Sequence, residues 1–337
     1  MNDRVSEAGG RASGAPGPSN EIGSRDVALK SALQAARRTG RILLGRHSRR
    51  IAYLKLSAST LLPARTLGSR IRRKMARDRR PILTQTADKY AVRSYVRARI
   101  GPRYLTELYQ VVDRPEDLAW NHLPEQFVAK ATHGSGGIVI VWEGAPEDAH
   151  LPVGTEQKGL GRYLVHPSSF DRTSFASLAH VWLSQDYSWI PGRRKAPEWA
   201  YQDIEPRIIV EELLLDGGGL PDDYKLHVIG GQVRVIRVSR RGAMAQFHPD
   251  WRPLNAVESV GHKKYPPLQS PPGKPDRLPE MIRVAETLAE GLDFVRVDLY
   301  CLPDRVVFGE MTHYPANGKG RFDPPHVDRW LADFWPS

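Results

Sequence analysis

Two acidic residues near the end of the chain stand on neighbouring predicted strands. Residues 294–300 and 306–312 are rich in Val, Phe and Leu, and they are predicted to form a hairpin. Side chains alternate between faces along a strand, so Arg296 and Asp298 share one face, and Asp298 lies roughly opposite residues 309–310. Burying two like charges is unfavourable unless a cation neutralises them, and Mg²⁺ takes carboxylate oxygens. The hairpin therefore predicts a Mg²⁺ site at Asp298 and Glu310; a surface hairpin with one solvated face is the alternative.

A glycine-rich loop follows Lys130. Residues 127–131 and 138–142 are predicted to be neighbouring strands. The loop between them consists of Thr132, His133, Gly134, Ser135, Gly136 and Gly137. Glycines let backbone N–H groups approach phosphate oxygens, and a lysine beside them adds positive charge. The pattern indicates a phosphate-binding loop, although it lacks the GxxxxGK[ST] motif and joins two strands, as plain hairpin turns do.

Further charged residues lie at or near the ends of predicted strands. Glu211 and Glu212 directly follow the apolar residues 208–210, and Lys225 belongs to a strand over residues 223–227. A strand that changes from apolar to acidic often ends at a ligand, where a carboxylate can hold ribose hydroxyls. The alternatives are a charged strand end for the glutamates and a solvated side chain for Lys225.

Together these residues predict a site for a polyphosphate bound with Mg²⁺. The set comprises Lys89, Lys130, Lys225, Arg296, the loop 132–137, Asp298 and Glu310. The cations would offset the charge of a transferred phosphoryl group, and the metal would bridge its oxygens.

The elements that must position this set belong to a mixed α+β body. A helix is predicted from about residue 86 until Gly101, and a second one over residues 279–291. Residues 224–238 are predicted to form a hairpin with a two-glycine turn. Residues 242–278 hold many prolines and are predicted to be an extended loop.

The composition narrows the class of protein. The chain has 337 residues and a single cysteine, Cys301, so it has no internal disulfide framework and suits a reducing compartment. It contains no apolar run long enough to span a bilayer, and its N-terminus lacks the apolar core of a signal peptide. These features predict a cytoplasmic protein.

The basic charge is concentrated in an N-terminal arm. Residues 25–80 hold 17 lysines and arginines against two aspartates, interleaved with Ile and Leu, which predicts basic amphipathic helices. Residues 1–24 are rich in Gly, Ser, Ala and Pro and are predicted to be disordered. The arm could bind an anionic membrane surface, which would place the protein at the inner membrane face, or an acidic polymer. It could also pack on the body as a solvated helix pair. Nucleic acid is the least favoured partner, because Tyr53 is the arm's one aromatic residue.

The order of the motifs resembles the ATP-grasp superfamily. The matching motifs are Lys89, Lys130 with its glycine loop, Val210-Glu211-Glu212, Asp223-Tyr224-Lys225, Arg296-x-Asp298 and Glu310-x-Thr312. The segments closest to the TupA-like (teichuronopeptide biosynthesis) ATP-grasp proteins are Asp88-Lys89-Tyr90 with Arg93, residues 127–136, and Gly309-Glu310-Met311-Thr312 with Tyr314-Pro315. The resemblance covers about residues 81–325. It implies an α+β ATP-grasp domain over 81–337, in which two α+β subdomains, about 81–205 and 206–337, clasp ATP between antiparallel sheets.

The resemblance also implies which residues bind the nucleotide. Lys89 and Lys130 would hold the phosphates of ATP, with the loop 132–137 closing over them. Glu211 and Glu212 would flank adenine and ribose. These are cofactor-binding roles.

Catalytic and metal-binding roles fall on the C-terminal strands. Lys225 would approach the nucleotide, and Arg296 would stabilise an acyl-phosphate and the tetrahedral state that comes after it. Asp298 and Glu310 would ligate Mg²⁺. Thr312 stands where these enzymes commonly have Asn, so it would be a weaker ligand of a second metal ion.

The implied activity is ATP-dependent ligation of a carboxylate to an amine through an acyl-phosphate, in the synthesis of a cell-surface polysaccharide or peptide polymer. The Rossmann-like domain that usually comes first in such enzymes is not evident, which leaves the acceptor site open. A glycosyltransferase is one alternative, but the chain contains no DxD motif. A non-catalytic protein that binds an anionic polymer or membrane surface through the arm is another, and it leaves Arg296, Asp298 and Glu310 without a role.

Overall fold

The computed structural model describes residues 50–58, 60–61, 63–157, 160–188, 197–261 and 263–336. The predicted tail, residues 1–24, and much of the predicted arm, residues 25–49, lie outside this part. The chain divides into two compact units, Met1–Ile51 and Ala52–Ser337, and all of the sheets belong to the second. Among the described helices, none is long and apolar enough to cross a membrane.

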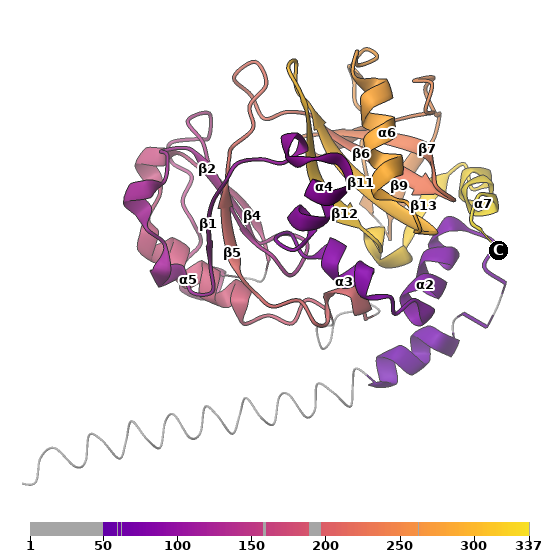
Figure 1. Cartoon of the computed structure of the whole chain (residues 1–337), viewed down its shortest axis with the longest axis horizontal. Coiled ribbons are helices and arrows are strands. Elements are labelled where there is room, and N and C mark those ends of the chain that lie inside the picture. The colour runs from indigo at the N-terminus through magenta and orange to yellow at the C-terminus, as the bar shows by residue number, and fades with distance from the viewer. Residues whose placement is uncertain are drawn as a thin grey trace, which may run out of the picture. The chain divides into compact units, whose positions relative to one another are not determined.

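The first sheet has five strands in the order β1-β5-β2-β3-β4 (Figure 1). Its strands are β1 (Leu108–Val112), β2 (Phe127–Ala131), β3 (Ile138–Val141), β4 (Arg162–Val165) and β5 (Ile208–Glu211). All neighbours are antiparallel except β3 and β4, which are parallel. The predicted pair of strands around the glycine loop is therefore β2 and β3. Their β-branched residues suit a pleated, buried surface.

Helix α5 (Arg172–Leu183) covers the first sheet. Asp171 caps the helix by accepting hydrogen bonds from the backbone N–H groups of the first turn. The helix buries Phe175, Leu178 and Trp182 in one hydrophobic core with β2, β3, β4 and β5. This packing anchors the strands that flank the glycine loop.

The second sheet is wholly antiparallel, with the order β12-β11-β6-β7-β8. Its strands are β6 (Asp223–Ile229), β7 (Gln232–Arg240), β8 (Ala243–Phe247), β11 (Phe294–Cys301) and β12 (Val306–Thr312). Gly230 and Gly231 form the predicted turn between β6 and β7, both with positive φ, which glycine adopts without steric penalty. Helix α6 (Leu278–Leu288) packs against β6, β7 and β11, and against α4 (Val92–Ile100).

A third, small sheet has the order β10-β9-β13. Its strands are β9 (Val257–Val260), β10 (Lys263–Lys264) and β13 (Gly320–Asp323). The prediction of one extended loop over residues 242–278 is wrong in part, because this region contains β8, β9 and β10. Its prolines flank these strands instead of interrupting them.

The remaining helices connect and cover the sheets. The α-helices are α2 (Leu67–Arg77), α3 (Pro81–Ala87) and α7 (His326–Asp333). The 3₁₀ helices are η1 (Pro102–Tyr104), η2 (Pro115–Asp117), η3 (Trp120–His122), η4 (Gly154–Glu156), η5 (Pro167–Ser169), η6 (Trp199–Tyr201) and η7 (Pro315–Gly318). The predicted helix that runs through Val92, Tyr95 and Val96 and ends at Gly101 is α4, and α3 is a separate helix before it.

Helix α2, at the end of the predicted arm, packs into the core of the body. Thr66 and Ser69 form a capping box at its start. Leu67, Ile71 and Met75 recur every four residues, so they share one face, and all three are buried. The body therefore begins before the expected boundary at Pro81, because the apolar face of this amphipathic helix covers η7 and α7.

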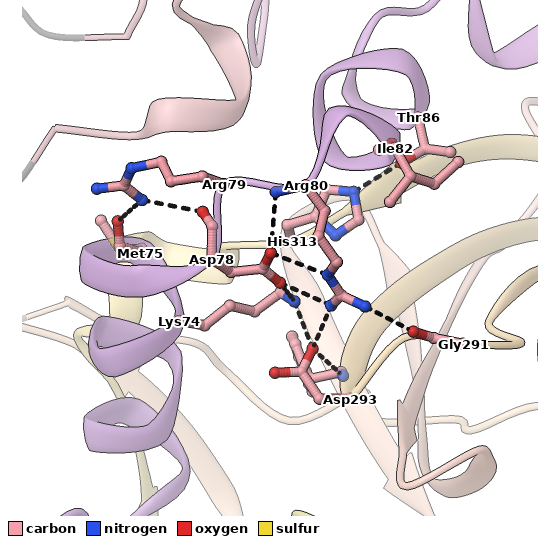
Figure 2. A network of polar contacts seen from close by, with 11 residues as sticks. Lys74, Met75, Asp78, Arg79, Arg80, Ile82, Thr86, Gly291, Asp293 and His313 are labelled. Atoms are coloured by element: carbon pink, nitrogen blue, oxygen red, sulfur yellow. Dashed lines mark hydrogen bonds and ion pairs between the residues drawn. The ribbon is translucent and has the colours of Figure 1, made fainter.

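An ion-pair network around the buried Lys74 holds α2 in place (Figure 2). Lys74, whose side chain is 0% exposed, donates to Asp78 at 2.7 Å and to Asp293, directly before β11. Arg80 donates to Asp78 and to the carbonyl oxygen of Gly291, at 2.7 Å in each case. Helix α2 is thus tied to the start of the strand that carries Arg296 and Asp298.

Candidate active site

A cavity of about 210 Å³ receives residues from both five-stranded sheets. Of the residues predicted to bind a nucleotide or metal, the cavity is lined by Lys89, Lys130, Ser135, Gly136, Glu211, Glu212, Lys225, Asp298 and Glu310. Thr132, His133, Gly134, Gly137, Arg296 and Thr312 do not line it. Residues far apart in the sequence thus meet in one place.

The predicted hairpin brings the two carboxylates together. Asp298 pairs with Glu310 across β11 and β12. A β-bulge at Gly309 makes this pairing, since an unbroken register from the turn would put Glu310 opposite Val297, on the other face of the sheet. A Cβ atom at Gly309 would lie 3.0 Å from the backbone oxygen of Asp298, so glycine suits the bulge.

Arg296 bridges the two carboxylates. Its Nε and Nη2 atoms donate to the two carboxylate oxygens of Asp298 at 2.6 and 2.7 Å, and Nη2 also donates to Oε1 of Glu310 at 2.9 Å. Burial alone would lower the pKa of Arg296, but the charges of Asp298 and Glu310 outweigh it and raise the pKa. Burial alone would raise the pKa of Asp298, but Arg296 and Lys225 bring it below its usual range. Asp298 is therefore an ionised carboxylate held in a buried position.

Lys225 completes the charge balance around Asp298. Its Nζ donates to Oδ2 of Asp298 at 2.7 Å and also to Asp223. Burial raises the pKa of Asp223, although Lys225 opposes the shift. Asp223 lines the cavity and was not among the predicted site residues. The spacing of Asp223 and Lys225 on one strand is the signal that could have found it.

Thr312 lies beside Arg296 and Glu310. Its hydroxyl accepts from Nη2 of Arg296 at 3.0 Å and donates to Oε1 of Glu310 at 3.1 Å. The hydroxyl thus helps to hold one oxygen of Glu310, and the side chain stays off the cavity wall.

On the facing sheet, Glu211 is the centre of a second ion-pair group. Lys130 donates to its Oε1 atom. Thr106 donates to Oε2 at 3.1 Å, and Arg93 approaches Oε2 at 3.4 Å. Arg93 and Thr106 both line the cavity. Neither was predicted to bind a ligand; Arg93 lies one helical turn beyond Lys89, which is the signal the sequence carries.

The glycine loop combines residues at the cavity with residues that support the loop. Nζ of Lys89 donates to the carbonyl oxygen of Gly134, and burial lowers the pKa of Lys89. The Thr132 hydroxyl donates to the Glu205 carbonyl oxygen at 3.1 Å, and a His133 ring nitrogen lies 3.0 Å from the Trp182 carbonyl oxygen.

The three glycines of this loop have no room for a side chain, and a Cβ atom at Gly136 would meet the backbone oxygen of Leu160. A Cβ atom at Gly134 would lie 2.6 Å from the ring of Tyr187, and one at Gly137 would lie 2.8 Å from Leu160. Gly137 also has a φ of +64°. These glycines shape the loop so that Ser135 and Gly136 face the cavity.

Glu212 lies at the border of the cavity and of an open groove. It accepts from the backbone N–H of Glu107 at 3.1 Å and from Arg305. The groove beyond it is lined by further charged residues, among them Arg103 and Arg277.

The apolar walls of the cavity were not predicted from the sequence. They consist of Val128, Ile138, Ile140, Ile209, Leu213, Leu214, Leu220 and Phe308. Alternation along β2, β3 and β5 predicts one face for several of these residues, but it does not predict that the face borders a cavity.

The residues of the cavity fit ATP and Mg²⁺. The apolar walls suit a purine ring, while Lys89, Lys130 and the loop suit phosphates. Among the described residues, no group of three or more His, Cys, Asp or Glu side chains is arranged to hold a metal ion alone. Mg²⁺ usually takes one or two carboxylates and completes its shell with water and phosphate oxygens. The pair Asp298 and Glu310 has that composition.

A family model matches most of the chain. The family model described as TupA-like ATPgrasp matches residues 69–158 and 168–335. No curated protein matches the sequence significantly.

Solved structures give distant matches. D-alanine–D-alanine ligase from Bacillus anthracis complexed with ATP is 11% identical, with a TM-score of 0.36 and coverage of 69% of this chain and 55% of that chain. The ATP-grasp ligase PsnB complexed with a precursor peptide and AMPPNP is 11% identical, with a TM-score of 0.33 and coverage of 69% and 51%. The ADP complex of purK, an N5-carboxyaminoimidazole ribonucleotide synthetase, is 14% identical, with a TM-score of 0.33 and coverage of 69% and 46%.

This chain thus spans about half the length of the solved structures that it matches. The family model, in contrast, extends from α2 to the end of α7 and covers both five-stranded sheets except β4. The chain belongs to the TupA-like ATP-grasp family.

Proposed function

We propose that the protein is an ATP- and Mg²⁺-dependent carboxylate–amine ligase. A substrate carboxylate oxygen attacks the γ-phosphorus of ATP, and the bond from that phosphorus to the bridging oxygen breaks, which yields ADP and an acyl-phosphate. An amine then attacks the acyl carbon, phosphate leaves, and the amine loses a proton to give the amide. The observation that carries the proposal is the arginine shared by two facing carboxylates, Asp298 and Glu310, at the edge of a cavity that also contains lysines and apolar walls.

The sheet containing β2 and β5 would bind the nucleotide. Lys89, Lys130 and the backbone at Ser135 and Gly136 offer positive charge and N–H groups to phosphate oxygens. Glu211 and Glu212 stand at the end of β5, where carboxylates can accept hydrogen bonds from ribose hydroxyls. The apolar walls exclude water from the adenine ring.

Asp298 and Glu310 would hold Mg²⁺, with the Thr312 hydroxyl beside them. When bound, Mg²⁺ neutralises charge on phosphate oxygens. In the structure Arg296 provides this neutralisation for the carboxylates themselves. Arg296 would also stabilise the negative charge of an acyl-phosphate and of the oxyanion of the tetrahedral state. Lys225, held by Asp223 and Asp298, would place a second positive charge near the nucleotide.

We further propose that the reaction belongs to the synthesis of a cell-surface polymer, with a uronic acid as the carboxylate and an amino acid as the amine. The basic residues 25–49 support a position at the inner membrane face or on an acidic polymer. Because α2 belongs to the core of the body, the test is deletion of residues 1–49 instead of the whole arm. Unchanged partition onto anionic vesicles after this deletion would refute the role of the arm.

The function is tested by thermal unfolding with and without Mg-ATP. A ligand at about 100 times its dissociation constant adds about 2.7 kcal/mol to the free energy of unfolding. We expect a Mg²⁺-dependent rise in Tm for the wild type, and a smaller rise for Lys130→Ala and Glu310→Gln. The exposed residues Lys274 and Glu143 provide the matched controls Lys274→Ala and Glu143→Gln. Absence of a shift in folded wild-type protein would refute the proposal.

A further inference from the structure

A row of polar side chains crosses the second sheet, one from each strand. Register pairs join Glu310 to Asp298, Asp298 to Lys225, Lys225 to Arg237 and Arg237 to Gln246. Directly opposed residues in antiparallel strands project from the same face. The row therefore continues from the three residues that line the cavity to β7 and β8.

The far end of this row is buried and has unsatisfied polar atoms. His227, which pairs with Arg296 across β6 and β11, is 3% exposed, Gln246 is 5% exposed and Arg237 is 9% exposed. Within the described part of the chain, no partner is found for either ring nitrogen of His227, for Nε of Arg237, or for either amide atom of Gln246. Buried polar groups in native proteins are nearly always hydrogen-bonded, so these atoms call for a ligand or ordered water.

The charge at this end of the row is balanced. Nη1 of Arg237 donates to Oε2 of Glu258, on β9, at 2.5 Å. Burial, together with the positive charges of Arg237 and Arg296, lowers the pKa of His227 well below its usual value, so its ring is neutral. A group that binds here therefore need not carry a charge.

The unsatisfied atoms include both donors and acceptors. The amide of Gln246 offers an N–H₂ donor and a carbonyl acceptor, a neutral imidazole offers one donor and one acceptor, and Nε of Arg237 offers a donor. A hydroxyl group both donates and accepts, so neighbouring hydroxyls on a ligand can satisfy all of these atoms. An aliphatic ligand would leave them unpaired.

We propose that His227, Arg237 and Gln246 form a subsite for the uncharged, hydroxyl-bearing part of the carboxylate substrate, whose carboxylate lies near Arg296. This inference rests on the proposed function, since it assumes that Arg296 marks the reacting end. The subsite selects polyhydroxylated acids over acids of the same size that lack hydroxyl groups.

The test uses the substitution Gln246→Met, which keeps the side-chain length and removes both amide atoms. Calorimetry and ADP release compare D-glucuronate, D-galacturonate and D-gluconate with tetrahydropyran-2-carboxylate, which has a ring and a carboxylate but no hydroxyls. We expect the wild type to prefer at least one hydroxylated acid by about 100-fold, and the variant to reduce this preference below about 10-fold. The same substitution at the exposed Gln232, the first residue of β7, is the matched control.

Thermal unfolding separates a binding role from a structural one. Because the amide of Gln246 lacks partners, Gln246→Met should leave the Tm unchanged or raise it, and the Mg-ATP shift should persist. A lowered Tm with an unchanged preference would mean that the amide binds a structural water only, and it would overturn the subsite. His227→Phe provides a second variant with the same expected loss of preference.

The subsite and the proposed function can fail separately. If Mg-ATP produces no shift, the ligase function fails, yet binding of a hydroxylated acid that is weakened by Gln246→Met would still support the subsite. If Mg-ATP binds and none of the three hydroxylated acids binds better than tetrahydropyran-2-carboxylate, the subsite is refuted and the ligase function stands.

Discussion

The two five-stranded sheets contribute to the cavity in different ways. The first sheet presents mainly Val and Ile from β2, β3 and β5, together with the Lys130–Glu211 pair. The second sheet presents Lys225, Asp298 and Glu310, interlocked through Arg296. An apolar wall contributes binding affinity in proportion to the area that it buries. In a group of buried ion pairs, by contrast, removing one charged side chain leaves its partner with an uncompensated charge. The first sheet should therefore tolerate small substitutions that the second does not.

The largest expected effect is on the second sheet. Asp298→Asn removes a charge that both Arg296 and Lys225 contact, so kcat/KM for ADP release should fall by about 10³-fold. Steady-state kinetics measures the change, with circular dichroism to establish folding and Glu143→Gln as the control. A fall of less than tenfold would mean that Asp298 does not take part in the reaction.

The next effect tests whether the second sheet depends on α2. Lys74→Met leaves the half-buried carboxylates of Asp78 and Asp293 without their shared ammonium group (Figure 2) and with Arg80 as the cation that still contacts both, so the free energy of unfolding should fall by about 2 kcal/mol. Urea denaturation measures it, and Lys274→Met at an exposed position is the control. Equal stability of the two variants would show that α2 is held by its apolar face alone.

A smaller effect concerns the glycine loop of the first sheet. Burial lowers the pKa of His133. At a pH below the unfolded-state pKa of about 6.5, His133 therefore binds a proton in the unfolded chain but stays neutral in the folded chain. The contribution of His133 to the free energy of unfolding is complete above pH 6.5. It decreases as the pH falls below 6.5, by up to about 1.4 kcal/mol per pH unit. Denaturation of wild type and His133→Asn between pH 7 and 5 should show a shallower slope in the variant. The exposed His122→Asn should keep the wild-type slope, and a His133→Asn slope equal to it would contradict the prediction.

The smallest effect is on the apolar wall. Ile138→Val removes one methylene group worth about 0.8 kcal/mol, so the Kd for ATP should rise about fourfold while kcat is unchanged. Equilibrium binding and kinetics measure the two quantities, and Ile282→Val in α6 is the matched control. A loss of kcat in Ile138→Val would break the distinction between the two sheets.

Much of the second sheet was predictable because its signals are local. The alternation in residues 294–300 and 306–312 and the Gly230-Gly231 turn depend on near neighbours in the sequence, and the structure has both hairpins. The resemblance to TupA-like ATP-grasp proteins was confirmed by the family match. The roles of the individual site residues stay predictions until the variants are measured.

Other features depended on partners that lie far away in the sequence. Helix α2 was predicted to belong to a basic arm, and whether the arm packs on the body was left open, because nothing near Leu67, Ile71 and Met75 indicates that η7 and α7 will cover them. The strands within residues 242–278 were missed because prolines are frequent there, although these prolines lie outside the strands. In each case a surface contributed by another element decides the outcome.

Local sequence was enough to predict the family, the two hairpins and the polar residue types that a phosphate and metal site needs, since these depend on motif order, alternation and turn chemistry. Long-range packing was needed to bring Arg93 and Thr106 into contact with Glu211, beside Lys130. It was also needed to align the strands so that the row of polar side chains runs from Glu310 on β12 to Gln246 on β8. Packing also placed Glu310 on the same face as Asp298, because the bulge at Gly309 shifts the register by one residue. A shift of one residue in the register moves a side chain to the other face of the sheet. Contacts between the strands determine this shift, and the amino-acid composition does not.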